Sequence, residues 1–549
     1  MKPNKKILAL YLLIALLVTT NSCTDDFKEL NTPTALLSEE MVDVNLLFTY
    51  VQFRSIFETR VELADASNHA GMYTREDNCP FCISFGSFSN LYTEFTNNLA
   101  TIIRKTENNP DQVNKKAIAR ILKVWAFAGA TDVFGDIPYF ESNRSPEEAI
   151  ASPVYDTQES IYKDFFKELK EAAAELDENK ESYGSADLMY QGDVEKWRKF
   201  ANSLRLRLAL RVRYADATLA AANMSDLEES DLIVNKSDDA VAYTNTDMSS
   251  NRNPRYNALV SDPVSFGKGD LPGKTLVDIL KDNNDPRIRI MVDTAKATFP
   301  PSLGIPYFGY RGRPLLGGVA VEEKYPYGAG SISDLSDFWF VPVVEVPFLK
   351  SSEVYFALAE AALFGLRDGD PNAYFQKGIA EGITWTKDFY ENSKSQFSSV
   401  AKLLHPTWTD EDVSAYLSHK EMQQDEIDAF LASPAATLTG SNEEKLEQIM
   451  NQKLIVLFPM GDEGWAEWRR TGYPRVLIGN DISDLKGVSP RRYRYPASEA
   501  LINSENYNTA VSRLGGTDGM LDRVWWDKNP LAPHKHPGVV ESRPAPWIN

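Results

Sequence analysis

The chain has 549 residues, with 58 basic and 78 acidic side chains and a net charge of −20. This acidic balance argues against a nucleic-acid ligand, because a phosphate backbone is bound through basic side chains. Hydrophobic residues make up 43% of the chain, which argues against intrinsic disorder, and the length suffices for two or three average domains or one large one.

The first 22 residues have the pattern of a secretory signal. Lys2, Lys5 and Lys6 precede the apolar run 7–18, which small polar residues follow. Twelve helical residues rise about 18 Å, less than the hydrocarbon thickness of about 30 Å, so this run is too short to span a membrane. We predict removal of residues 1–22, which leaves 55 basic and 78 acidic residues.

Cys23 lies where the apolar signal gives way to polar chain, the position at which bacterial lipoproteins are cut and acylated. Ser22 suits the cleavage site, whereas Thr20 replaces the usual leucine, and an ordinary signal peptide with a nearby cysteine is the alternative. Several acyl chains, at about 0.8 kcal/mol per buried CH₂, would hold the protein firmly on a membrane. We predict a lipid anchor at Cys23 and a polar tether over residues 23–40. The acidic pair at 25–26 resembles a tag that directs lipoproteins to the cell surface.

Two further cysteines, Cys79 and Cys82, lie within an irregular stretch over residues 68–90. Export favours a small disulfide ring between them, with free thiols as the alternative. The flanking sequence is typical of a loop, whereas a redox motif would open a helix after a strand. Two thiols with no nearby histidine also argue against a zinc site.

Helical periodicity follows along most of the mature chain. Apolar residues recur at spacings of three and four in 118–129 and again in 161–176, which is typical of one buried helix face. Many of the predicted helices form neighbouring pairs, as in helical-repeat proteins, although no sequence repeat of about 34 residues is evident. Further helices are predicted near 44–64, 90–106, 193–213, 351–365, 372–385, 443–458 and 462–470.

Residues 204–213 test this interpretation, because apolar and basic side chains alternate there as in a strand. Upstream, however, Trp197, Leu204 and Leu208 follow a helical stripe, and Asp193 stands where a helix N-cap belongs. We therefore predict a helix.

Periodicity disappears between about 235 and 345, where proline, glycine and aromatic residues are dense. So long an irregular stretch inside a folded protein is usually functional. Aromatic faces suit sugar rings, and neighbouring polar groups can bond the hydroxyls, although most aromatic side chains pack in cores. The predicted ligand contacts, which include residues of the shorter stretch 68–90, are Tyr73, Phe81, Phe85, Tyr310, Arg311, Tyr325, Tyr327 and Trp339.

Motifs for catalysis or metal binding are missing or incomplete. Residues 273–275 end like a phosphate-binding loop, but the preceding glycine spacing fails, so a turn before a helix is the better interpretation. Residues 368–372 open like a calcium loop whose later glycine and glutamate are absent, which favours an interhelix turn. We predict no enzymatic activity, cofactor or metal, while a carboxylate pair of the glycosidase type stays open as an alternative.

Five segments taken in chain order closely resemble the SusD/RagB-like outer-membrane lipoproteins, and in particular SusD-like family 2. They are "FGDIPYFES", "KWRKFANSLRLRLALRV", "EVYFALAEAALFG", "GWAEWRRTGYPRV" and "RRYRYPASEALINSENYN". The resemblance implies that residues 41–549 form a single ligand-binding domain of mostly α structure. This domain would contain about four tetratricopeptide-like helix pairs, long irregular loops and minor β structure.

The resemblance also implies a function. Proteins of this kind are non-enzymatic and face the cell exterior from the outer membrane, to which a lipid anchors them. They bind a nutrient oligosaccharide and deliver it to a SusC-like TonB-dependent transporter. Peptide cargo in the same role is the first alternative, and a secreted carboxylate-based hydrolase is the second.

Overall fold

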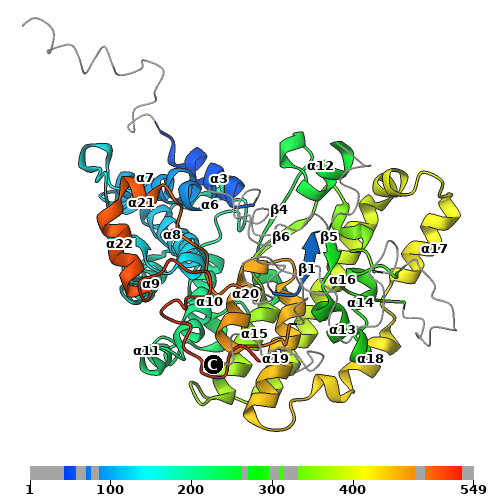
Figure 1. The fold of residues 1–549 in the computed structure, drawn as a ribbon. Helices are drawn as coiled ribbons and strands as arrows, with labels where there is room; N and C mark the ends of the chain where they lie inside the picture. Colours follow the sequence, from blue (N-terminus) through cyan, green and yellow to red (C-terminus); the bar gives the residue numbers. More distant parts are fainter. Residues whose placement is uncertain are drawn as a thin grey trace, which may run out of the picture.

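A computed structural model describes residues 42–56, 70–75, 86–261, 270–295, 309–313, 332–476 and 489–534. Helices dominate these residues, and short two-stranded antiparallel sheets lie among them (Figure 1). Within the described ranges, no helix is both long and apolar enough to cross a membrane.

The N-terminal half of the described chain is a stack of helices in which each packs on the next. Helix α7 packs on α8, α8 on α9, and α9 on α10, while α3 covers α7 (Figure 1). Neighbouring helices joined in this order are the arrangement expected of helix pairs. The helices of this half are α3 (Val44–Arg54), α6 (Gly86–Asn90), α7 (Asn97–Thr106), α8 (Val113–Phe134), α9 (Gln158–Glu175), α10 (Val194–Val212) and α11 (Ala217–Ala222).

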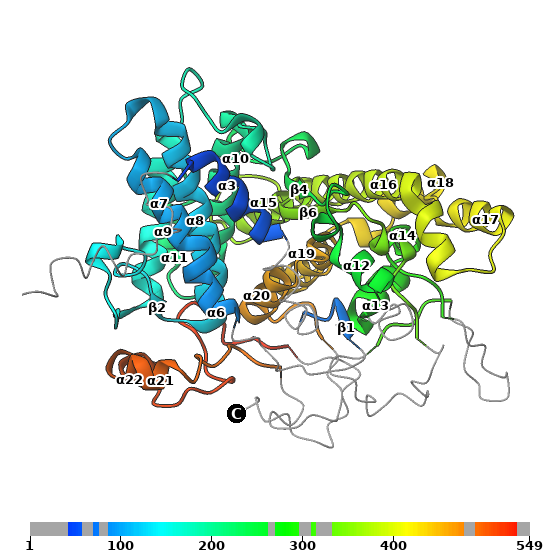
Figure 2. The ribbon, with the colours of Figure 1, turned by 90° about the horizontal axis from the view of Figure 1, so that it is seen from above.

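The C-terminal half continues the stack, because α10 packs on α15, which contacts both α16 and α19. Figure 2 shows α17 and α18 at one end of the molecule and α21 and α22 at the other. The helices are α12 (Pro254–Ser261), α13 (Lys274–Asp282), α14 (Ile288–Met291), α15 (Ser351–Leu363), α16 (Pro371–Leu404), α17 (Asp410–Lys420), α18 (Gln424–Leu431), α19 (Asn442–Leu457), α20 (Gly461–Thr471), α21 (Glu499–Ile502) and α22 (Ser504–Arg513).

Local sequence signals explain several helix ends. Asp193 caps α10 by accepting a hydrogen bond from the backbone N–H of Lys196 at 3.1 Å, so the helix predicted for this alternating segment is confirmed. Gly135 ends α8 with a φ of 89°, a conformation that favours glycine, and its N–H donates to Thr131 at 2.8 Å. Asp370 caps α16, so residues 368–370 form the expected interhelix turn and residues 371–372 already begin the helix.

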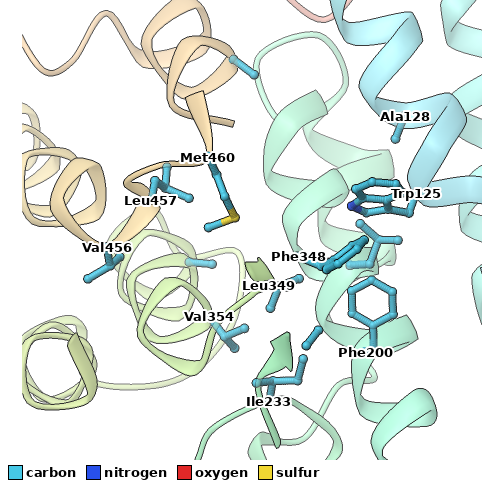
Figure 3. Close-up of a cluster of buried hydrophobic side chains, with 14 of the residues drawn as sticks. Trp125, Ala128, Phe200, Ile233, Phe348, Leu349, Val354, Val456, Leu457 and Met460 are labelled. Atoms are coloured by element: carbon cyan, nitrogen blue, oxygen red, sulfur yellow. The ribbon is translucent and has the colours of Figure 1, made fainter. Parts of the chain in front are cut away.

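The hydrophobic core extends through both halves. Trp125 of α8 packs on Phe348 at a ring-centroid distance of 4.9 Å, and Phe200 of α10 lies beside them (Figure 3). Leu349 and Val354 continue the cluster toward α19 (Figure 3). Burial of these large side chains stabilises the junction between α8, α10 and α15.

The strands are short and pair over long sequence distances. Strand β1 pairs with β5, β2 with β3, and β4 with β6, each antiparallel. Only the second pairing joins strands that follow one another, so the other two fasten distant segments together. The strands are β1 (Tyr73–Arg75), β2 (Ile137–Pro138), β3 (Tyr155–Asp156), β4 (Ala240–Tyr243), β5 (Asp270–Pro272) and β6 (Glu345–Leu349).

A buried network of ion pairs runs between the central helices. Arg207 donates to both carboxylate oxygens of Glu353 at 2.8 Å. Arg470 contacts both carboxylate oxygens of Glu360, at 2.5 Å and 2.7 Å. Buried charges are tolerated only when they are paired in this way. The network connects α8, α10, α15, α19 and α20 through Asp132, Arg207, Arg211, Arg213, Glu353, Glu360, Lys453, Glu463, Glu467 and Arg470.

Candidate functional site

Three segments that are far apart in sequence meet at one place, which we call the loop junction: residues 70–75, 270–275 and 309–313. Strand β1 pairs with β5 so that Tyr73 lies opposite Pro272. The N–H of Arg313 then donates to the carbonyl of Pro272 at 2.8 Å, which adds the third segment. The two irregular stretches that the sequence marked as functional are therefore hydrogen-bonded to each other (Figure 1).

Glycines allow the three backbones of the loop junction to approach closely. A Cβ on Gly273 would collide with the carbonyl oxygen of Gly71, and a Cβ on Gly312 would lie 2.5 Å from that of Gly273. Gly71 also has a φ of 74°, which few other residues adopt. The nearest atoms are main-chain atoms at Gly273 and Gly312 and the side chain of Thr275 at Gly71, so an added Cβ at any of the three would force a shift.

Tyr310, within the loop junction, is half-buried and interacts electrostatically with Arg289 of α14, with Asp293 and with Glu426 of α18. The neighbouring segment is fixed by Asp293, whose carboxylate accepts from Tyr416 at 2.9 Å and pairs with Lys420 at 2.6 Å. Ala295 donates its N–H to the carbonyl of Gly309 at 2.7 Å, which ties this segment to the loop. We call Tyr310, Arg289, Asp293 and Glu426 the Tyr310 region.

Charged side chains near Tyr310 shift the pKa of its hydroxyl in opposite directions. Burial raises the pKa of Tyr310 to about 12; Arg289 lowers it, whereas Asp293 and Glu426 raise it. Arg289 and Glu426 form an ion pair, and about a third of each side chain is exposed. The region thus combines an aromatic surface with a cation and an anion that water can reach, groups that suit a polyhydroxylated ligand.

Two other predicted ligand contacts, Trp339 and Arg311, are buried in the structure. Trp339 is only 3% exposed: its ring lies 4.3 Å from that of Phe389 and its Nε1 donates to the carbonyl of Met291 at 3.1 Å. It is therefore a core residue in this structure, because the short helix at 337–340 turns it inward. Arg311 is also buried. Its backbone N–H donates to the hydroxyl of Ser333 at 2.9 Å, and the N–H of Ser333 donates to the carbonyl of Arg311 at 2.8 Å.

Several predicted positions lie outside the described residues. These are the lipidation site Cys23, the pair Cys79 and Cys82, and the aromatic residues Phe81, Phe85, Tyr325 and Tyr327. Of the predicted ligand contacts, the structure therefore places only Tyr310 on a partly open surface and Tyr73 in the adjoining strand.

Residues 273–275 are explained without a phosphate. Gly273 precedes α13, and Lys274 begins the helix with its N–H donating to the carbonyl of Arg313 at 2.6 Å. Among the described residues, no three histidine, cysteine or acidic side chains lie close enough to hold a metal ion.

Sequence reasoning missed Arg289, Asp293 and Glu426, the polar members of the Tyr310 region. They come from different elements, and nothing in their local sequence distinguishes them from other surface charges. The close contact of Gly71, Gly273 and Gly312 had a weak signal in the recurrence of glycine within the irregular stretches.

Comparison with protein families gives a match over most of the chain. SusD-like family 2, described as starch-binding and associating with the outer membrane, matches residues 32–496. The chain belongs to this family. SusD-like proteins are associated with the outer membrane and bind nutrients, in agreement with the resemblance noted in the sequence. A search of curated proteins gave no match.

Solved structures confirm the mostly α, tetratricopeptide-like fold of this SusD-like chain. A chitin-binding protein is 26% identical, with a TM-score of 0.70, over 89% of this chain and 100% of its own. A SusD homologue from Bacteroides uniformis is 26% identical, with a TM-score of 0.66, over 89% and 100%. A chitin-binding SusD homologue from Flavobacterium johnsoniae is 24% identical, with a TM-score of 0.65, over 88% and 99%.

Proposed function

We propose that this SusD-like chain is a surface lipoprotein that binds a nutrient oligosaccharide and delivers it to a SusC-like TonB-dependent transporter. The observation that carries the proposal is the Tyr310 region, where a half-buried aromatic ring adjoins the partly exposed pair Arg289 and Glu426. Family membership supports the binding role, and the predicted acylation of Cys23 supports attachment to the outer membrane.

One protein of similar structure indicates which oligosaccharide to test first. The chitin-binding protein that is 26% identical makes β-linked N-acetylglucosamine oligomers the leading ligand, and the family description makes maltooligosaccharides the second. Short peptides form a third set, because Arg289 and Glu426 offer a cation and an anion that peptide termini would also bind.

Calorimetry with these three ligand sets tests the proposal. We expect Tyr310→Ala to weaken binding of the preferred glycan about tenfold or more, which corresponds to at least about 1.4 kcal/mol. Tyr50→Ala is the matched control, because this tyrosine is partly exposed on α3, away from the Tyr310 region. Equal affinity in both variants would remove Tyr310 from the site, and binding of peptides alone would change the cargo.

Turnover must be measured with the same ligands. Intact glycan recovered after prolonged incubation supports a binding protein, whereas released product would establish a hydrolase. Mass spectrometry of the protein from native membranes tests the anchor, because acylation at Cys23 adds the mass of fatty chains to the first peptide.

A further inference from the structure

Two buried arginines, Arg469 of α20 and Arg491 of the segment 489–493, are each hydrogen-bonded to the main chain of the other. Arg469 donates from Nη1 to the carbonyl of Arg491 at 3.0 Å, and Arg491 donates from Nη2 to the carbonyl of Arg469 at 2.7 Å. The rings of Trp465 and Trp526 lie against the guanidinium of Arg469, at 3.7 Å and 4.8 Å from its Cζ to the ring centroids. We call Arg469 and Arg491 the arginine pair. Their exposed fractions are 0% and 5%, so both cations belong to the interior.

Each member of the arginine pair has one buried guanidinium nitrogen without a hydrogen-bond acceptor among the described residues. Arg469 uses Nε and Nη1 for backbone carbonyls, and its Nη2 has no partner. Arg491 uses Nε and Nη2 for the carboxylate of Asp527, and its Nη1 has no partner. An aromatic face attracts a cation but accepts no hydrogen bond from an N–H group that points past it. Because a buried, charged donor loses its hydration without compensation, these two nitrogens favour an acceptor that is not part of the chain.

The arginine pair also carries more positive charge than its surroundings balance. Within the ranges that the structure describes, Arg469 forms no ion pair with a carboxylate, since its hydrogen bonds go to carbonyl groups. Arg491 shares the buried carboxylate of Asp527 with Arg523, which is partly exposed. Three cations therefore face one anion, and two of these cations are buried. A buried charge that is not paired is costly, so the surplus favours a negative acceptor.

The neighbouring ion-pair network does not supply that negative charge. Asp132 is the network member that attracts Arg469, but one of its carboxylate oxygens accepts from Arg211 and the other from Nε1 of Trp526. Burial lowers the pKa of Arg469 to about 9 despite the attraction of Asp132. The network itself is balanced, because its five cations face five carboxylates: Arg207, Arg211, Arg213, Lys453 and Arg470 against Asp132, Glu353, Glu360, Glu463 and Glu467.

This surplus of charge distinguishes the arginine pair from other buried arginines of the described chain. Arg287 and Arg470 also have one nitrogen without a partner. Each of them, however, is paired with a buried carboxylate, Arg287 with Asp285 and Arg470 with Glu360. A neutral acceptor such as water is sufficient for a nitrogen of that kind. The arginine pair requires an acceptor that also carries negative charge.

We propose that the arginine pair binds one small monovalent anion, chloride, which accepts hydrogen bonds from Nη2 of Arg469 and from Nη1 of Arg491. A spherical ion suits two donors that belong to separate side chains, whereas a carboxylate or a phosphate is typically bound by the paired nitrogens of one guanidinium. The anion connects α20 to the segment 489–493 and stabilises the folded state. This inference is independent of the proposed function, because it requires neither the glycan nor the transporter.

Anomalous diffraction tests the site directly, with crystals of the wild-type mature chain grown in sodium bromide. Bromide replaces chloride and scatters anomalously, so we expect a peak within hydrogen-bond distance of Nη2 of Arg469 and Nη1 of Arg491. The unpartnered Nη1 of Arg287 is the control in the same crystal, and we expect no peak there because Asp285 balances its charge. Ordered water without anomalous signal beside the arginine pair would overturn the proposal.

Thermal melting in solution separates a specific site from an ion bound only at crystal concentration. The Tm of the wild-type mature chain is measured in sodium chloride and in sodium gluconate at equal ionic strength, so that general screening is constant. We expect chloride to raise Tm by roughly 1–4 °C, with saturation, because it binds the folded state alone. Equal Tm values at an ionic strength of about 0.15 M would mean an adventitious ion only and would overturn the proposal.

A pair of variants assigns the chloride effect to the arginine pair. Arg469→Lys keeps the positive charge and removes Nη2, so we expect the rise of Tm in chloride to be lost. Arg287→Lys removes an unpartnered nitrogen from a charge-balanced arginine and should keep that rise. A rise in Arg469→Lys equal to that of wild type would contradict the assignment. The wild-type measurements in bromide, chloride and gluconate decide the proposal even if a variant does not fold.

Discussion

Burial separates the aromatic residues that the sequence placed in one class. Tyr310 and Trp339 both lie in an irregular, aromatic-rich stretch, yet only Tyr310 is partly open to water. Trp339 contacts Phe389 and Phe458 inside the core. We therefore expect Trp339→Ala to lower the free energy of unfolding by about 3–5 kcal/mol, measured by chemical denaturation. Trp339→Phe keeps part of the packing and is expected to lose less; a stable alanine variant with weaker glycan binding would contradict this assignment.

Asp239 gives a prediction about pH. Burial raises its pKa to about 7, against an ordinary 3.8, although it accepts a hydrogen bond from the N–H of Ser351 at 2.6 Å. Because the folded state holds the proton more tightly than the unfolded state, this group favours folding at low pH, and its contribution is lost as pH rises from about 4 to 7. Thermal melting of Asp239→Asn, which keeps the acceptor, should therefore gain on wild type as pH rises from about 4 to about 7. A constant difference would exclude the titration of Asp239.

At the scale of elements, the helices were largely readable from sequence. For α10, the helical stripe and the Asp193 cap gave the correct prediction despite the strand-like alternation of apolar and basic residues. Two of the alternating arginines, Arg207 and Arg211, are buried in the helix and paired with acids. Pairing of this kind depends on side chains from other helices, so the sequence of α10 alone could not show why basic residues occupy its buried positions.

The loop junction provides a test on single backbone positions. Gly273→Ala places a methyl group against the carbonyl of Gly71, so we expect a loss of about 1–3 kcal/mol in the free energy of unfolding. Gly129→Ala is the control: it lies within α8, and an added Cβ would meet no atom within 4 Å. Helix propensity predicts that this control gains about 0.5–1 kcal/mol. Equal effects of the two substitutions, measured by urea unfolding, would show that the backbones at the junction separate easily.

Across the whole molecule, the buried ion pairs bind helices that lie far apart in sequence. Burial alone would raise the pKa of Glu360, but Arg470 and Arg213 outweigh burial and lower it, so its charge stabilises the fold at neutral pH. We expect Glu360→Gln to cost about 3–5 kcal/mol, because it removes the buried anion shared by Arg213 and Arg470 and leaves Arg470 paired with Glu467. Glu159→Gln, from an exposed pair on α9, is the control and should leave urea unfolding close to wild type. An equally small effect at Glu360 would mean that water replaces the lost partner.

Prediction from sequence reached further for the scaffold than for the site. Five motifs in chain order, beginning at residue 134, identified the family. Motifs of this kind are continuous in sequence, so they can be recognised without a structure. The Tyr310 region is assembled from α14, the loop junction and α18, and its charged members have no shared spacing. Residues from such separate elements become recognisable as a group only in three dimensions.

The meeting of Gly71, Gly273 and Gly312 also bears on protein engineering. Because an added Cβ at Gly273 or Gly312 would meet main-chain atoms at 2.2 Å and 2.5 Å, a combinatorial library that varies the side chains of the loop junction should keep both glycines fixed.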